Sequence, residues 1–320
     1  MSRNRLPWEE GFLSGDVRSL ARAITQVENQ PETVYGFLGD VAERLGKAHI
    51  IGITGPPGAG KSTLTGRLAA EFAARGFSLG LLLVDPSSPF TGGAILGDRL
   101  RLPDIAGKPG VYVRSMSSRG SMGGLSRATG DAVKLLDAFG KDIIIVETVG
   151  TGQSETDVIS VVDSVVVISV PGLGDDIQAM KAGILEIADL FVVNKADREG
   201  ADRTERELRS MLRLQPQKDG WEIPVLRTVA TTHEGVPELV DKLLEHRLFL
   251  EDSGQIVDRR LRRVQRELDQ LLSARLTRQL QQLLGEDVLA AAARRVALGQ
   301  QTVYQMAEEL WQTLVAGLAR

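Results

Sequence analysis

The chain of 320 residues contains no cysteine and only three histidines. The absence of cysteine excludes disulfide bonds and cysteine-ligated metal, and it fits a cytoplasmic protein. The histidines, His49, His233 and His246, lie far apart in the sequence and make a poor metal-binding set. We therefore do not expect a metal carrier that depends on cysteine or histidine ligands.

A large excess of charge and a long apolar run are also missing. Lys and Arg number 38 against 42 Asp and Glu, a formal net charge of −4; this balance gives nucleic-acid binding no overall support, although it does not exclude a local basic patch. The longest apolar run, VISVVDSVVVISV, is interrupted by Asp163 and too short to span a bilayer. The first residues, MSRNRLPWEEGF, lack the apolar core of a signal peptide. We expect a soluble cytoplasmic protein with no nucleic-acid and no membrane partner.

The distribution of apolar residues divides the chain into three parts. Residues 14–45 carry two helical patterns. From residue 49, short strands such as HIIGITG and SLGLLLVD alternate with helical segments, which predicts an α/β fold with a doubly wound, mainly parallel sheet. After residue 252 only helical patterns follow, one of them long and charged. We predict an N-terminal helical extension (1–46), an α/β domain (47–251) and a C-terminal helical arm (252–320).

The stretch GPPGAGKST, directly after the first predicted strand, matches the phosphate-binding loop G-x-x-x-x-G-K-[S/T]. Its glycines let backbone N–H groups point toward a phosphate chain, and the start of the next helix adds positive potential. Lys61 would reach the β- and γ-phosphates, and the Ser62 hydroxyl would ligate Mg²⁺. The alternative is a glycine-rich turn that only packs, which does not require this spacing. The predicted nucleotide-binding residues of the loop are Gly55, Pro57, Gly58, Ala59, Gly60, Lys61, Ser62 and Thr63.

The tetrapeptide NKAD at 194–197 follows the predicted strand DLFVV, at the strand end where open α/β sheets bind ligands. The Asp197 carboxylate can accept from guanine N1–H and from the N2 amino group, whereas adenine would leave it unpaired. Asn194 would brace the loop, and the stem of Lys195 would cover the purine. A chance N-K-x-D in a solvated turn is the alternative. The sequence therefore predicts GTP as the nucleotide.

Acidic residues follow two further predicted strands. Asp85 and Asp98 lie in VDPSSPFTGGAILGDRLR, while Glu147 and Gly150 lie in IIIVETVGTGQSE. Carboxylates at strand ends beside a triphosphate can hold Mg²⁺ or its waters, and glycines beside them permit movement. Taken alone, Asp85 and Asp98 are equally well explained as turn or helix-capping residues. Their neighbourhood favours the metal site.

The groups that would organise hydrolysis are incomplete in the sequence. A small GTPase places a water-orienting glutamine after the glycine at position 150, but this chain has Thr151 there and Gln153 two residues later. Intrinsic hydrolysis is therefore expected to be slow and to need outside completion. The segment VPGLGDDIQAMKAGILEIADL carries Asp175 and Lys181. These are explained either by a solvated helix face or, for Lys181, by a mobile cation that approaches the phosphoryl group.

The chain resembles the MeaB-type G-protein chaperones of cobalamin-dependent acyl-CoA mutases, which include proteins once labelled ArgK. The resemblance covers nearly the whole chain and rests on GPPGAGKST, VDPSSPFTGGAILGDRLR, RGSMGGLSRAT, VETVGTGQSE, GDDIQAMKAGILEIADLFVVNKAD and the helical tail. It implies a homodimeric P-loop GTPase that uses Mg²⁺ and docks on methylmalonyl-CoA mutase or a relative. There it gates adenosylcobalamin delivery and protects or reactivates the holoenzyme.

The resemblance also implies roles for single residues. Asp85, Asp98 and Glu147 match acidic positions on the Mg²⁺ side, and Lys181 matches the lysine of an extra switch that senses the mutase. The resulting catalytic candidates are Lys61, Glu147 and Lys181, and the metal candidates are Ser62, Asp85, Asp98 and Glu147. Gly150, Asn194, Lys195 and Asp197 complete the predicted nucleotide site. The segment RSMSSRGSMGG contains two arginines, Arg114 and Arg119, and we assign no role to either.

Three other functions were compared with this one. A nickel-insertion GTPase needs Cys or His ligands, which this chain lacks or scatters. A signal-recognition GTPase needs a Met-rich domain, and the chain has six methionines. A transport-linked protein kinase or ATPase is not distinguished from a slow GTPase by any feature of the sequence. Nor does the sequence name the mutase.

Overall fold

The computed structural model describes residues 5–85, 102, 104–117, 127–148, 160–172, 184–214 and 220–318. The chain divides into two compact units, Met1–Asp258 and Arg259–Arg320. Across the described residues, no helix is both long and apolar enough to cross a membrane.

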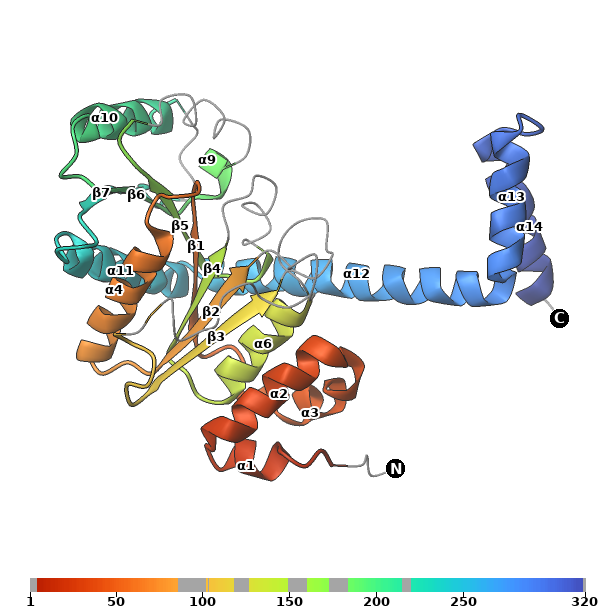
Figure 1. Cartoon of the computed structure of the whole chain (residues 1–320), viewed down its shortest axis with the longest axis horizontal. Helices are drawn as coiled ribbons and strands as arrows, with labels where there is room; N and C mark the ends of the chain where they lie inside the picture. Colours follow the sequence, from red (N-terminus) through yellow and green to blue (C-terminus); the bar gives the residue numbers. More distant parts are fainter. Residues whose placement is uncertain are drawn as a thin grey trace. The chain divides into compact units, whose positions relative to one another are not determined.

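The first unit is built on a sheet whose neighbouring strands are all parallel. The strands are β1 (His49–Thr54), β2 (Leu79–Asp85), β3 (Val111–Ser117), β4 (Ile143–Thr148), β5 (Ser164–Ser169), β6 (Leu190–Asn194) and β7 (Val225–Thr228). Their order in the sheet is β3-β2-β4-β1-β5-β6-β7 (Figure 1). Strands β2 to β4 lie on one side of β1 and β5 to β7 on the other, so the direction of winding reverses at β1. This confirms the predicted doubly wound α/β fold, in which ligands bind beyond the carboxyl ends of the strands near the reversal.

Helices cover both faces of this sheet, because successive strand residues point to opposite sides. In β1, Ile51 and Ile53 pack in one hydrophobic cluster with α4 and α11, whereas Ile50 packs in the other with α2, α6 and α10. Both clusters are fully buried, which accounts for strands that are apolar on both faces. The helices involved are α2 (Val17–Asn29), α4 (Lys61–Ala74), α6 (Arg127–Ala138), α10 (Ala201–Leu212) and α11 (Val236–Asp252), with the short α9 (Ile184–Ile187) before β6.

The N-terminal helices pack into the same hydrophobic cluster as one face of the sheet. Phe37 meets Trp8 and Phe12 edge to face, with ring centroids 4.9 and 5.0 Å apart. Arg114 of β3 donates to Glu28 of α2 at 2.5 Å, so this arginine ties the edge strand to the N-terminal helices. These helices are α1 (Glu9–Leu13), α2 and α3 (Tyr35–Asp40), with the 3-10 turns Pro31–Thr33 and Ala42–Arg44.

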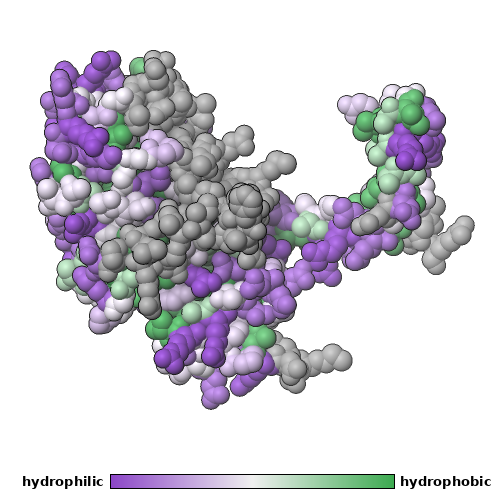
Figure 2. All heavy atoms as spheres, in the orientation of Figure 1, coloured by the Kyte–Doolittle hydropathy of each residue, from purple (hydrophilic) through white to green (hydrophobic). Residues whose placement is uncertain are grey.

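The second unit holds most of α12 (Gln255–Leu284), followed by α13 (Glu286–Ala297) and α14 (Val303–Leu318). Helices α13 and α14 form a hairpin that buries Ala292, Met306 and Leu314 and carries an ion pair between Arg295 and Glu309 at 3.1 Å. Figure 2 shows hydrophobic residues at the surface of this hairpin among hydrophilic ones. Helix α12 buries no side chain. Its exposed apolar residues are Val257, Leu261, Val264, Leu268, Leu272, Leu276 and Leu283.

Candidate functional site

The loop Gly55–Gly60 connects the carboxyl end of β1 to the first turn of α4. Gly55 has φ +144, and a Cβ there would collide with the carbonyl oxygen of Ile168. Gly60 has φ +86, and a Cβ there would lie 2.5 Å from the side-chain nitrogen of Asn194. Only glycine fits either position, so the loop backbone closely approaches Ile168 of β5 and Asn194 of β6. The N-cap residue Gly60 provides no side-chain cap for α4, and the N-terminus of a helix is where backbone N–H groups bind anions.

Lys61 begins α4 and is almost fully buried, with 8% of its surface exposed. Its ammonium donates to the carbonyl oxygens of Gly55 at 2.7 Å and Pro56 at 3.0 Å. The side chain therefore bends back over its own loop. This holds a positive charge at the N-terminus of α4, where the helix dipole already favours a phosphate.

The Ser62 hydroxyl donates to the Glu147 carboxylate, with 2.5 Å between the two oxygens. Strand β4 pairs with β1 so that Ile53 lies opposite Glu147, and this register brings the carboxylate to the start of α4. Glu147 is 4% exposed. Two side-chain oxygens thus meet beside the phosphate loop, and oxygen is the ligand atom that Mg²⁺ prefers.

The other predicted metal and switch residues are less fully described. The backbone of Asp85 ends β2, which pairs with β4 on the same edge of the sheet, but its side chain lies outside the described part. Asp98, Gly150 and Lys181 also lie outside the described residues. Within the described part, no three His, Asp or Glu side chains are grouped to hold a metal ion.

Asn194, the last residue of β6, joins three segments at the carboxyl edge. Its side-chain nitrogen donates to the carbonyl of Ala59 in the phosphate loop at 2.8 Å. Its side-chain oxygen accepts from the Thr228 hydroxyl at 3.0 Å and from the Ala230 N–H at 3.2 Å. Because Asn194 is 1% exposed, water does not compete for these bonds. The loop that follows β6 is thereby fixed against two neighbours.

Lys195 and Asp197 follow Asn194 with their side chains nearer to solvent. Lys195 has a left-handed backbone, φ +56, and its ammonium donates to the carbonyl of Gly58 at 2.6 Å. Its stem therefore crosses toward the phosphate loop. The Asp197 side chain is exposed, so a ligand can reach its carboxylate.

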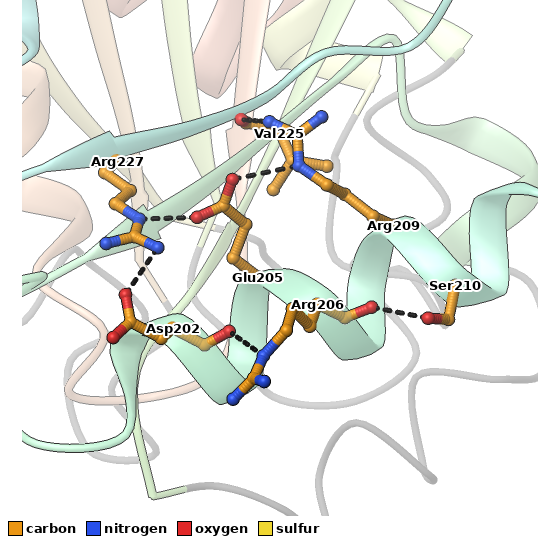
Figure 3. Close-up of polar contacts among 7 residues, drawn as sticks. All are labelled: Asp202, Glu205, Arg206, Arg209, Ser210, Val225 and Arg227. Atoms are coloured by element: carbon orange, nitrogen blue, oxygen red, sulfur yellow. Dashed lines mark hydrogen bonds and ion pairs between the residues drawn. The ribbon is translucent and has the colours of Figure 1, made fainter.

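Thr228 and Ala230 belong to this edge, although the sequence analysis did not include them. They lie at and just beyond the end of β7, the strand beside β6. A charged network fixes β7 against α10: Arg227 bonds Glu205 at 2.5 Å and Asp202 at 2.7 Å, and Arg209 bonds the same Glu205 at 2.9 Å (Figure 3). The strand pattern PVLRTV could have pointed to Thr228 and Ala230, because a strand that pairs in parallel with β6 ends at the same edge of the sheet.

Comparison with known proteins identifies the family. The family model described as "Methylmalonyl Co-A mutase-associated GTPase MeaB" matches residues 20–283. A Pyrococcus abyssi protein that carries a GTPase name is 46% identical over 311 residues, covering 96% of each chain. GTPase ArgK of Escherichia coli is 35% identical, with 76% of each chain covered. The methylmalonic aciduria type A homolog of Caenorhabditis elegans is 36% identical over 78% of this chain and 68% of its own length.

Among solved structures, the LAO/AO transport system kinase superposes with a TM-score of 0.76 over 98% of this chain and 99% of its own. At 24% identity this likeness shows the fold alone. The relatives named as GTPases and the family match together establish the activity class and guanine nucleotide binding. The chain belongs to the family of methylmalonyl-CoA mutase-associated GTPases of the MeaB type.

Proposed function

We propose that this GTPase is a chaperone for an adenosylcobalamin-dependent acyl-CoA mutase, methylmalonyl-CoA mutase or a relative, in the cytoplasm. It would gate delivery of the cofactor and protect or reactivate the holoenzyme. The observation that carries the proposal is the extent of the family match, from α2 to the end of α12. The match therefore includes helices on both sides of the nucleotide-binding core, which a generic GTPase does not need.

The phosphate loop supplies the binding part of the proposed mechanism. On nucleotide binding, the Lys61 ammonium would exchange the Gly55 and Pro56 carbonyls for phosphate oxygens, which are stronger acceptors because they carry charge. The short side-chain exchange needs no movement of α4. On the base side, the exposed Asp197 would accept from guanine N1–H and the N2 amino group.

Mg²⁺ fits the oxygens that meet beside the loop. Ser62 and Glu147 would hold it directly or through water, and we propose Asp85 and Asp98 as further ligands. When bound, Mg²⁺ would neutralise part of the phosphate charge. A serine hydroxyl can offer an oxygen lone pair to an ion while its proton is still donated, so Glu147 would hold the Ser62 rotamer in place for the ion.

We propose that the docked mutase completes the catalytic site for hydrolysis. No glutamine follows Gly150, and Lys181 lies in a glycine-flanked segment that a docked mutase would move toward the γ-phosphate. Bound nucleotide must then change the affinity for the mutase by the same factor as the mutase changes the affinity for nucleotide.

Two copies of the chain would form the working assembly. The exposed apolar residues of α12 recur at spacings of three, four and seven, so they lie along one face of the helix. A second copy offers a matching face, as in a two-fold symmetric interface. Leu261→Asp with Leu268→Asp should give monomers by light scattering because it charges this face. Gln270→Asp, on the opposite face of α12, should leave a dimer. A double variant that stays dimeric would remove α12 from the interface.

The function is tested with purified protein and the mutase encoded in the same organism. Phosphate release from GTP should be slow alone and rise when the mutase is added. Lys181→Ala should keep basal hydrolysis and lose most of the stimulation. A mutase that neither co-purifies in a nucleotide-dependent manner nor changes the rate would exclude the chaperone role. Radiolabel found on protein rather than in free phosphate would favour a kinase instead.

A further inference from the structure

Arg67 closes a ring of hydrogen bonds through four segments of the nucleotide site: the phosphate loop, the end of β6, the loop after β7 and α4. Starting at the phosphate loop, Ala59 accepts from Asn194, and Asn194 accepts from Ala230. The carbonyl of Ala230 then accepts from the Arg67 side chain at 3.1 Å. Arg67 lies on α4, the helix that begins at Lys61 in the phosphate loop, so the ring returns to its start.

Ala230 is held in the ring through both of its backbone polar groups. Its N–H donates to Asn194, and its carbonyl accepts from Arg67, so the side chains of two different elements fix one residue of the loop after β7. A second Arg67 nitrogen donates to the Thr231 carbonyl at 3.4 Å. The guanidinium is planar and presents its donors in a fixed fork, so it restrains the orientation of both carbonyls.

The loop after β7 has an internal bridge of its own. Val229 pairs with Glu234, and the Thr232 N–H donates to the Val229 carbonyl at 3.0 Å. These bonds make the loop a compact turn, and its orientation depends on hydrogen bonds from neighbouring elements. At its start those hydrogen bonds come from Asn194 on β6 and Arg67 on α4.

We propose that Arg67 is a positioning residue for guanine recognition. By holding Ala230, Arg67 would fix the position of Asn194 at the end of β6. Asp197 lies three residues after Asn194, so the position of its carboxylate would be fixed as well. Arg67 also connects the phosphate side and the base side of the site through α4, so that a nucleotide engaging both sides meets a prearranged geometry. The inference rests on the proposed guanine site at Asp197.

The test compares Arg67→Ala with Arg75→Ala in the full-length protein. Arg75 lies two turns further along α4 and also bonds across to another helix, through Pro237 and Asp241 on α11, but it does not contact residues 228–231. Each variant is titrated with GDP, IDP and ADP, and its thermal unfolding is recorded. IDP lacks the 2-amino group, so the ratio of IDP to GDP dissociation constants reports the placement of Asp197.

Arg67→Ala should weaken GDP binding about tenfold, in line with the loss of a hydrogen bond to a charged group, and should lower the preference for GDP over IDP. Arg75→Ala should change GDP affinity by less than about twofold, because its partners Glu71, Asp241 and Pro237 are not members of the ring. Arg67→Lys keeps the charge without the fork and should fall between Arg67→Ala and wild type, which also covers the case that the alanine variant fails to fold.

Equal GDP affinities and equal IDP-to-GDP ratios in Arg67→Ala and Arg75→Ala would overturn the inference, even if both variants melt at lower temperature. If that occurs while the wild-type protein prefers GDP to ADP, only the role of Arg67 is wrong. A wild-type protein that binds ADP as tightly as GDP would instead overturn the guanine site, and the role of Arg67 with it.

Discussion

Buried polar side chains meet at both edges of the sheet. At the carboxyl edge, Asn194 connects three loops, and the exposed Asp197 follows it. At the amino edge, the Ser164 hydroxyl lies 2.7 Å from both His49 Nε2 and His246 Nδ1. His246 Nε2 lies 3.6 Å from an Asp189 carboxylate oxygen. The amino edge thus brings together the residue types of a Ser-His-Asp catalytic triad.

Access to solvent separates the two edges. Ser164 and His246 are 0% exposed, so no substrate can reach the hydroxyl. The Ser164 hydroxyl has a single proton, so it donates to one imidazole and accepts from the other, and both of its contacts are structural. The carboxyl edge instead combines rigid glycine turns with side chains that reach solvent. Residue types at the right distance therefore do not make a site unless a ligand can approach them.

The largest effect should come from the phosphate loop. Lys61→Ala removes the buried ammonium that bonds the Gly55 and Pro56 carbonyls of the loop. GTP hydrolysis should fall on the order of 10³-fold, because the developing phosphate charge loses a cation. Phosphate release under saturating GTP measures it, with the unfolding temperature as a control. A rate within about tenfold of wild type would contradict the assigned role of Lys61.

The next largest effect should come from the base side. Asp197→Asn exchanges two carboxylate acceptors for an amide, so GTP binding should weaken on the order of 100-fold, about the worth of two charged hydrogen bonds. XTP should gain affinity, because its O2 accepts from the new amide nitrogen. Competition of both nucleotides against fluorescent GDP measures the exchange. Unchanged affinities for both would mean that Asp197 does not recognise the base.

Ser164→Ala sharpens the comparison between the edges from the opposite side. It removes a buried hydroxyl that two imidazoles contact, so the free energy of unfolding should fall by about 2 kcal/mol. GDP affinity should stay unchanged, because the amino edge does not face the nucleotide. Ser210→Ala, at an exposed hydroxyl, is the control and should lose little. A stable Ser164→Ala protein with weakened GDP binding would show that the two edges communicate.

The smallest effect should come from Glu71 on α4, and it should appear in the stability of the protein. Hydrogen bonds from His233 and then Arg75 hold the pKa of Glu71 below its usual range. A carboxylate with a lowered folded-state pKa stabilises the protein above its unfolded-state pKa and loses this contribution as pH falls through the folded-state pKa. Glu71→Gln should therefore be slightly less stable than wild type near neutral pH. Denaturant unfolding should show the difference vanishing in acid; a gap that widens there would have the wrong sign.

The local motifs determined much of this protein by themselves. GPPGAGKST and NKAD specify backbone conformations and donor groups at fixed spacing, so the phosphate loop and the base loop could be located without a structure. Runs apolar on both faces likewise determined the parallel sheet, since only a sheet covered on both sides buries them. The family resemblance followed from the motifs in combination, and the family match confirmed it.

Only the tertiary structure decided which distant residues complete the site. Thr228 and Ala230 resemble ordinary strand-end residues in the sequence, and Arg67 resembles any arginine on an amphipathic helix. Thr228 and Ala230 meet Asn194 because β7 pairs with β6, and Arg67 reaches Ala230 because α4 packs near the loop after β7. The same holds for Ser164, which is far from His49 and His246 in the sequence: strand pairing and the packing of α11 bring its hydroxyl to 2.7 Å from each. Spacing along the chain encodes contacts within a loop or a helix, whereas contacts between elements depend on strand order and register, which arise only when the whole sheet has formed.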